Sequence, residues 1–124
     1  MAAPNIVNVT SIFGKTVYDT NVSTSSTIQL QNAVNSNKVM KINTIIAANI
    51  DGTNAADITV LVTNTSGTAL FYLARTISVP ADSSLVVISK DTSFYLEEDR
   101  QIRAFASSSS DLSLMTSYEE IDDA

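Results

Sequence analysis

Apolar and polar residues alternate through many short segments of this sequence, and this alternation limits the folds that the chain can adopt. In one such segment, Ile102, Ala104 and Ala106 are separated by Arg103 and Phe105. Because successive side chains of a strand point to opposite faces of a sheet, the alternation predicts strands with one buried face. Val, Ile and Thr, which pack well on a pleated surface, make up about 30% of the 124 residues. We therefore predict an all-β fold.

The segment 40–50 departs from this simple alternation. Ile42 and Ile46 fall on even positions, whereas Ile45 and Ala47 fall on odd positions. A strand that is apolar on both parities is typical of a sheet that is covered on both faces. We therefore predict that this segment is a central strand covered on two sides.

Turn-forming residues separate the strand segments. The run Asn64-Thr65-Ser66-Gly67 is typical of a hairpin loop in which Gly67 takes a positive φ. Pro80 interrupts strand pairing because it has no N–H group for a ladder hydrogen bond. The pattern predicts roughly eight or nine short strands, which is typical of sandwiches and jelly rolls. We predict a single antiparallel β-sandwich that is jelly-roll-like.

The length of 124 residues fits one domain, and we assign residues 1–124 to it. Residues 1–4 are expected to form a short N-terminal arm. Residues 119–124 contain four of the 13 acidic residues and are expected to form an acidic C-terminal tail. The rest of the chain is nearly neutral, so it offers no positive surface to attract nucleic acid.

The sequence contains no His, no Cys and no Trp. Imidazole is the commonest general base, and imidazole and thiolate are common ligands of transition metals, so most familiar catalytic schemes are excluded. We expect no enzymatic activity and no cofactor. No run approaches about 18 apolar residues, and the N-terminal residues lack the basic start of a signal peptide. We therefore expect neither a membrane partner nor a cleaved signal.

Asp51, Asn54 and Asp57 place three oxygen-bearing side chains on one loop. Calcium binds 6–8 oxygens, so these side chains together with backbone carbonyls are weak candidates for a metal site. The spacing of an EF-hand loop is absent, and an Asp-Gly turn flanked by Asn is common in hairpins. A structural turn is therefore favoured over a metal site.

Glu97, Glu98 and Asp99 form a short acidic run. Two carboxyl groups can act as acid and base on a sugar when one of them lies in an apolar pocket. Consecutive residues of a strand point to opposite faces, so three acidic residues in a row are more typical of a solvated turn. We favour the solvated turn and keep carboxylate-based hydrolysis as the alternative.

Four tyrosines, Tyr18, Tyr72, Tyr95 and Tyr118, are candidates for a subunit interface. The phenylalanines are expected in the core, and an adjacent pair such as Phe71-Tyr72 places one ring inside and the other outside. Tyrosine is enriched at protein–protein interfaces. With no Trp and few basic neighbours, these rings do not form an obvious stacking surface for bases or sugars.

Several segments of the chain carry a resemblance to a known group of proteins. They are APNIVNVTSI at 3–12, GKT at 14–16, NSNKV at 35–39, KIN at 41–43, NIDGTNAAD at 49–57, VPAD at 79–82, VISK at 87–90 and SYEEI at 117–121. Together they resemble small virion structural proteins of tailed bacteriophages, especially marine and cyanobacterial ones. That family often has a Gly near position 98 or 99, where this chain has Glu98-Asp99-Arg100. None of these segments is a catalytic motif.

The resemblance implies a non-enzymatic virion component, and we expect a capsid decoration (cement) protein. The alternatives are a neck or tail accessory protein, or a module that binds glycans or a host surface. The expected partners are copies of the chain itself, as a homotrimer suggested by the local symmetry of capsids, and the major capsid protein or another virion protein. The expected location is the virion, which is assembled in the host cytoplasm.

Overall fold

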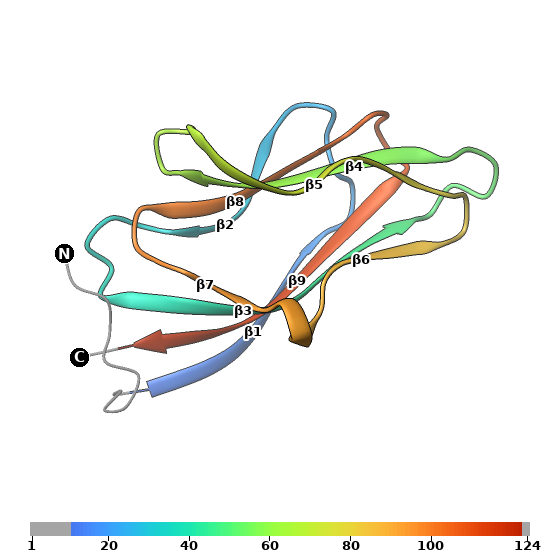
Figure 1. The fold of residues 1–124 in the computed structure, drawn as a ribbon. Coiled ribbons are helices and arrows are strands. Elements are labelled where there is room, and N and C mark those ends of the chain that lie inside the picture. Colours follow the sequence, from blue (N-terminus) through green and yellow to red (C-terminus); the bar gives the residue numbers. More distant parts are fainter. Residues whose placement is uncertain (1–10, 123–124) are drawn as a thin grey trace.

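The computed structural model describes residues 11–122, which form two antiparallel sheets packed face to face (Figure 1). This part of the chain consists of nine strands and one short 3-10 helix. They are β1 (Ser11–Asp19), β2 (Thr27–Asn32), β3 (Lys38–Asn49), β4 (Ala56–Asn64), β5 (Ala69–Val79), β6 (Ser84–Ile88), η1 (Lys90–Thr92), β7 (Phe94–Leu96), β8 (Arg100–Ala106) and β9 (Leu112–Asp122). Within residues 11–122, no helix has the length and apolar character needed to cross a membrane.

The strand order is that of a jelly roll. The first sheet has the order β1-β9-β3-β6, and β7 also pairs with β3, so that β6 and β7 share one edge of this sheet. The second sheet has the order β2-β8-β4-β5. All pairings are antiparallel. β9 lies between β1 and β3 in the first sheet, and β8 lies between β2 and β4 in the second sheet, so the last strands of the sequence pair with the first ones. The prediction of an all-β, jelly-roll-like sandwich with eight or nine strands is confirmed.

The central strand β3 is apolar on both parities because it contains a bulge. The register with β9 shifts between Ile42 and Thr44, so the inward face moves from even to odd positions. Ile42 and Ile45 are therefore both fully buried, whereas Ile46 is only partly buried. The bulge, rather than a second covered face, explains why Ile42 and Ile45 are both in the core, whereas Val39, on the opposite parity before the bulge, is 5% exposed and lies outside that core cluster.

The core lies between the two sheets and is built from the inward faces of their central strands. Ile58, Val60 and Ile102 from the second sheet face the same cluster as Ile42 and Ile45 from the first, and all five are 0% exposed. Burying each such side chain contributes about 1.5–3 kcal/mol relative to exposure. The apolar residues of the alternating pattern thus form the contact that stabilises the packing of the two sheets.

Two buried asparagines connect the sheets at opposite ends of β3. Asn49 Nδ2 donates to the carbonyl of Val79, in β5 of the second sheet, over 2.9 Å. Asn32 Nδ2, on β2 of the second sheet, donates to the carbonyl of Leu96 in the first sheet over the same distance. A buried amide is costly unless it is hydrogen-bonded, so these contacts restrict how the sheet ends are aligned.

The loops follow the predicted turn chemistry in part. Gly67 has a φ of 92° and closes the β4–β5 hairpin, in which its N–H donates to the Asn64 carbonyl over 2.9 Å. This confirms the predicted hairpin. Asp99, near the position where the resembled family often has Gly, has a φ of 62°. Asp tolerates this left-handed conformation better than most residues, which explains how the turn forms without Gly.

The predicted acidic tail is wrong for residues 119–122. These residues belong to β9, where Glu120 pairs with Phe13 of β1 and Met40 of β3 and is only 7% exposed. Pairing on both sides makes this segment part of the sheet rather than a solvated end. The predicted arm, residues 1–4, and the last two residues lie outside the described part of the chain.

Candidate interaction surface

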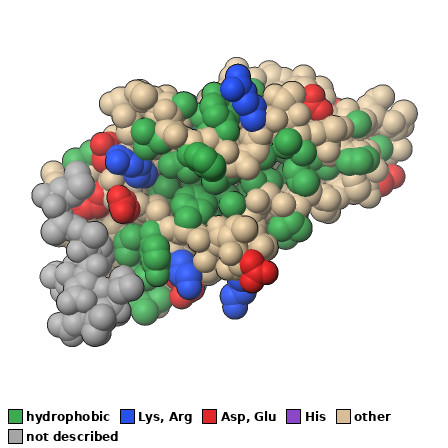
Figure 2. Space-filling view, in the orientation of Figure 1, with side chains coloured by type: hydrophobic (Ala, Val, Ile, Leu, Met, Phe, Trp, Pro, Cys, Tyr) green, Lys and Arg blue, Asp and Glu red, His purple; other side chains and the backbone are tan. Residues whose placement is uncertain are grey.

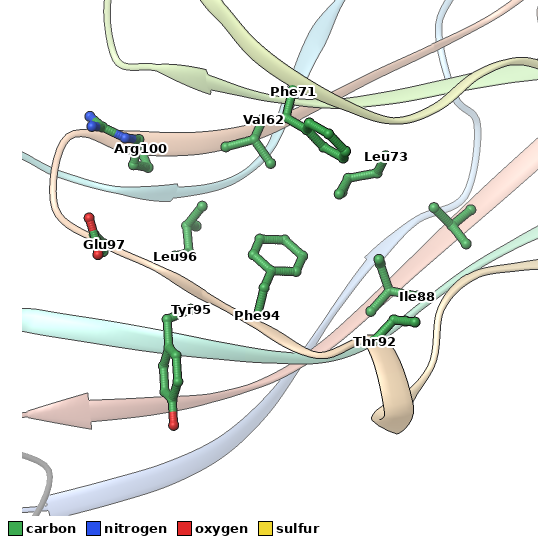
Figure 3. Close-up of a pocket in the computed structure, with 11 residues that line it drawn as sticks. Val62, Phe71, Leu73, Ile88, Thr92, Phe94, Tyr95, Leu96, Glu97 and Arg100 are labelled. Atoms are coloured by element: carbon green, nitrogen blue, oxygen red, sulfur yellow. The ribbon is translucent and has the colours of Figure 1, made fainter.

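An apolar cleft opens on one side of the sandwich, between edge strand β5 and the β6–η1–β7 segment. It has a volume of about 650 Å³. Figure 3 shows Phe71 and Leu73 of β5, Val62 of β4 and Phe94 of β7 directed toward the same space. The residues that line it are Val62, Phe71, Leu73, Val87, Ile88, Thr92, Phe94, Tyr95, Leu96, Glu97 and Arg100.

The cleft is apolar along most of its length and polar at one end. Arg100 and Glu97, which flank the β7–β8 turn, lie at that end (Figure 3). Phe71 is 66% exposed at the mouth. The register of β5 with β4 shifts between Val62 and Thr63 and at two further places, so this end of β5 does not follow the regular sheet. A large ring left in water beside an apolar cleft is typical of a binding surface.

A row of four apolar side chains crosses the outer face of the first sheet. Tyr18 lies opposite Met115, Met115 opposite Ile46, and Ile46 opposite Val86. Tyr18 is 71% exposed and Val86 is 57% exposed. Sequence reasoning missed this row, because the bulge in β3 decides that Ile46 rather than Ile45 points outward. The row gives the sheet an uncharged stripe on its solvent side.

Two long strands, β1 and β5, each form an outer edge of the described sandwich. Ile12 and Phe13 on β1 are 53% and 51% exposed, and Leu70 on β5 is 50% exposed. Figure 2 shows hydrophobic side chains gathered in a band across the face of the molecule that is turned toward the viewer. Edge strands that carry apolar residues are ready to pair with another strand unless charges protect them.

The ionisable side chains on these two edges are engaged within the chain. Lys15 Nζ lies 3.0 Å from Glu120 Oε2, and Asp19 Oδ2 accepts a hydrogen bond from Gln29 Nε2 over 2.9 Å. The Arg75 guanidinium lies 4.8 Å from the centre of the Tyr72 ring. The edges therefore have few charges directed away from the molecule.

Three of the four candidate interface tyrosines lie at the surface. Tyr18 is 71% exposed, Tyr95 48% and Tyr72 39%. Tyr95 points away from its neighbour Phe94, as alternation on a strand requires (Figure 3). They lie on β1, β7 and β5 respectively, so they belong to separate parts of the surface rather than to one cluster.

Tyr118 is not a surface residue. It is 6% exposed and belongs to the core cluster, because it follows Leu112 and Leu114 on the inward parity of β9. Its selection as an interface candidate is therefore wrong. The alternation in the segment 112–118 already placed it on the apolar parity, and that signal outweighs the general preference of tyrosine for interfaces.

The acidic run Glu97, Glu98 and Asp99 forms a turn that is only partly solvated. Glu98 is 4% exposed, and neither of its carboxylate oxygens has a hydrogen-bond partner in the structure. The expectation of a solvated turn is thus wrong for Glu98. Asp99 accepts hydrogen bonds from the hydroxyl and the N–H of Thr65, and these bonds, helped by the charge of Arg100, hold the pKa of Asp99 below its ordinary value.

The candidate metal residues Asp51, Asn54 and Asp57 form hydrogen bonds to other residues of the chain. Asp51 accepts hydrogen bonds from the Thr53 N–H over 2.9 Å and from Asn54 Nδ2 over 3.2 Å, and these bonds lower the pKa of Asp51. Asp57 is the second residue of β4, opposite Ser78 of β5, and its N–H donates to the Ser107 hydroxyl. Across residues 11–122, no three His, Cys, Asp or Glu side chains are grouped so that they could hold a metal ion.

Residues 11–122 form an all-β jelly-roll domain in which β1 and β5 are edge strands without a further partner in this part of the chain, and an apolar cleft lies beside β5. No protein-family model matches the chain, and no curated protein matches it. The chain is similar to a solved structure from Bacillus endospore appendages, which form a novel family of disulfide-linked pili. The TM-score is 0.54, the identity is 12%, and the similarity covers 92% of this chain and 90% of the other. At this identity the similarity shows a shared fold.

Proposed function

We propose that this chain is a non-enzymatic structural component of a bacteriophage virion, and specifically a capsid decoration protein that acts through protein–protein contacts. The observation that carries the proposal is the amount of apolar side chain exposed on the cleft, on both strand edges and on the row across the first sheet. Exposed apolar surface of this kind stabilises a complex when a partner covers it.

Three further points support a structural role. The jelly roll is a common fold of viral capsid domains. The similar solved structure comes from pili, which are assemblies of repeated subunits, although these 124 residues contain no cysteine and would have to assemble without disulfides. A virion presents many equivalent positions, so modest contacts at each one add up to strong attachment. The virion location itself is supported by the sequence resemblance.

The first test is the oligomeric state of the purified protein. Sedimentation velocity over a wide range of protein concentrations should give a closed homo-oligomer, and the trimer is the expected form. The interface, once seen in a structure of the oligomer, should bury more than about 1,000 Å². A strictly monomeric protein at high concentration would contradict the self-association that the proposal requires.

The second test is the location of the protein in assembled particles. Particles purified from the biological source of the sequence should contain the chain by mass spectrometry, and electron cryomicroscopy should place it on the capsid surface. Density at the neck or tail would instead support an accessory protein of that region. Absence of the chain from such particles, together with a monomeric state, would remove the proposal.

A second candidate function is recognition of a glycan or a host surface in the apolar cleft. The aromatic rings of Phe71 and Phe94 border the cleft, and Glu97 and Arg100 place polar groups at one end. Rings beside a few polar groups are typical of small-ligand sites. A glycan array, probed with and without calcium, tests this candidate, and a blank array would remove it.

A further inference from the structure

We propose that copies of this chain assemble head to tail, with the free edge of β1 in one copy pairing with the free edge of β5 in the next. This inference rests on the proposed structural function and names the surfaces that would carry it. The occupant of the cleft beside β5 is thus the β1 strand of a second copy.

The two edges are similar in length. β1 has nine residues and β5 has 11. Both stand at the end of their sheet in the described chain, so one side of each strand has backbone donors and acceptors without a neighbouring strand. Nine residues at about 3.3 Å each limit the contact to about 30 Å, and the three register shifts of β5 against β4 shorten the part that can pair regularly.

The side chains of both edges favour contact over solvent. Phe13 and Tyr18 on β1, and Leu70 and Phe71 on β5, are 50–71% exposed. Soluble proteins normally protect long edges with outward charges, and here Lys15, Asp19 and Arg75 each contact a group of their own copy, although Lys15 and Arg75 remain exposed. The cleft next to β5 leaves room for apolar side chains of an incoming strand.

The two edges lie on opposite sides of the sandwich, which favours head-to-tail pairing over pairing of like edges. β1 and β2 are neighbours at one side, whereas β5 and β6 are neighbours at the other. A symmetric β5–β5 or β1–β1 dimer would cover one edge and leave the other exposed. A single β1–β5 contact repeated between copies covers both edges of every copy. Such a contact closes into a ring, such as a trimer, or extends into a filament, depending on its rotation.

Two paired-lysine variants test the inference. The β1 variant is Phe13→Lys with Tyr18→Lys, and the β5 variant is Leu70→Lys with Phe71→Lys. The matched control, Val34→Lys with Ile50→Lys, adds the same charge at exposed apolar residues in loops, which are 50% and 61% exposed. Circular dichroism and thermal melting establish that each variant is folded. Sedimentation velocity then gives the oligomeric state of each variant and of their equimolar mixture.

Head-to-tail pairing predicts a distinctive result. Each edge variant alone should be monomeric, while the control should assemble like the unmodified protein. The equimolar mixture should form a 1:1 dimer and nothing larger, because only one intact β1 and one intact β5 edge meet. If one edge variant alone forms dimers, a symmetric contact through its intact edge is present and the inference is overturned. If the unmodified protein assembles but the mixture stays monomeric, the inference fails and the proposed function stands.

A cross-linking measurement gives an independent readout, since the chain has no native cysteine. Tyr18→Cys and Phe71→Cys proteins, prepared separately and given different mass tags, are mixed and oxidised. The mixed β1–β5 disulfide should exceed both homodimeric disulfides several-fold. Homodimers in equal or greater amount would contradict the inference. An unmodified protein that is monomeric throughout would overturn both the inference and the self-association in the proposed function.

Discussion

Lys15 Nζ on edge strand β1 lies 3.0 Å from Glu120 Oε2 on β9. Lys38 Nζ lies 3.5 Å from the same oxygen. Burial by itself raises the pKa of Glu120, but the hydrogen bond from Lys15 and the charges of Lys38 and Lys15 outweigh burial, so the pKa of Glu120 lies below its ordinary value of 4.5. The carboxylate thus joins β1 to the end of β9 and to the start of β3.

The Glu120 contact predicts a specific dependence of stability on pH. Because the folded pKa is depressed, the ionised carboxylate stabilises the fold above pH 4.5, and this contribution is lost as pH falls through the folded pKa. Glu120→Gln should lower the free energy of unfolding by about 1 kcal/mol or less at pH 7. Urea unfolding at several pH values from 7 to 3 should show this difference shrinking below pH 4.5. A difference that stays constant over that range would contradict the assignment.

Tyr118 and Tyr18 should respond differently to the same truncation. Tyr118→Ala removes a ring that is 6% exposed in the core, and the cost should be about 3–5 kcal/mol. Tyr18→Ala removes a ring that is 71% exposed, and the cost to the isolated monomer should be below about 0.5 kcal/mol. Chemical denaturation at a low protein concentration measures both. Equal costs would show that Tyr118 is not a core residue.

Asn49 should tolerate neither truncation nor a charge. Asn49→Ala leaves the carbonyls of Asn54 and Val79 without their 2.9 Å donors, and the cost should be about 1–3 kcal/mol. Asn49→Asp replaces the donating amide with an acceptor that faces two carbonyls, so it should be at least as destabilising at pH 7. Thermal and urea unfolding give both values. Asn54→Ala is the comparison variant, because it keeps the backbone carbonyl that Asn49 binds and removes only the exposed hydrogen bond from Asn54 Nδ2 to Asp51. A neutral Asn49→Ala would argue against a sheet-connecting role.

Asp99 combines a left-handed backbone with hydrogen bonds to Thr65, and substitutions separate these two effects. Asp99→Asn keeps an acceptor and tolerates a φ of 62°, so it should be the mildest change. Asp99→Gly keeps the backbone conformation but loses the hydrogen bonds. Asp99→Ala loses the bonds and adds backbone strain, so it should have the lowest melting temperature of the three. If Ala equals Gly in melting temperature, the left-handed conformation does not limit the choice of residue.

The alternation in the sequence was sufficient to predict the fold class and most of the core, since a sandwich requires one apolar face per strand. It was insufficient where the register changes. The β3 bulge between Ile42 and Thr44 moves the inward-facing residues from even to odd positions, and no local residue pattern predicted this bulge. The cleft and the cross-strand row were also out of reach, because they join strands that only the topology brings together. The burial of Glu98 was not predicted for the same reason, since it depends on the folding of the β7–β8 turn.

The neighbouring residues Ile45 and Ile46 test the bulge directly. Ile45 is fully buried, so Ile45→Ala should lower the free energy of unfolding by about 2–5 kcal/mol. Ile46 lies on the outer face between Met115 and Val86, and Ile46→Ala should cost about 1 kcal/mol in a monomer. Unfolding of both variants at low protein concentration measures the pair under identical conditions. Without the bulge, Ile46 would share the inward parity of Ile42, so a larger cost for Ile46→Ala than for Ile45→Ala would contradict the register described for β3.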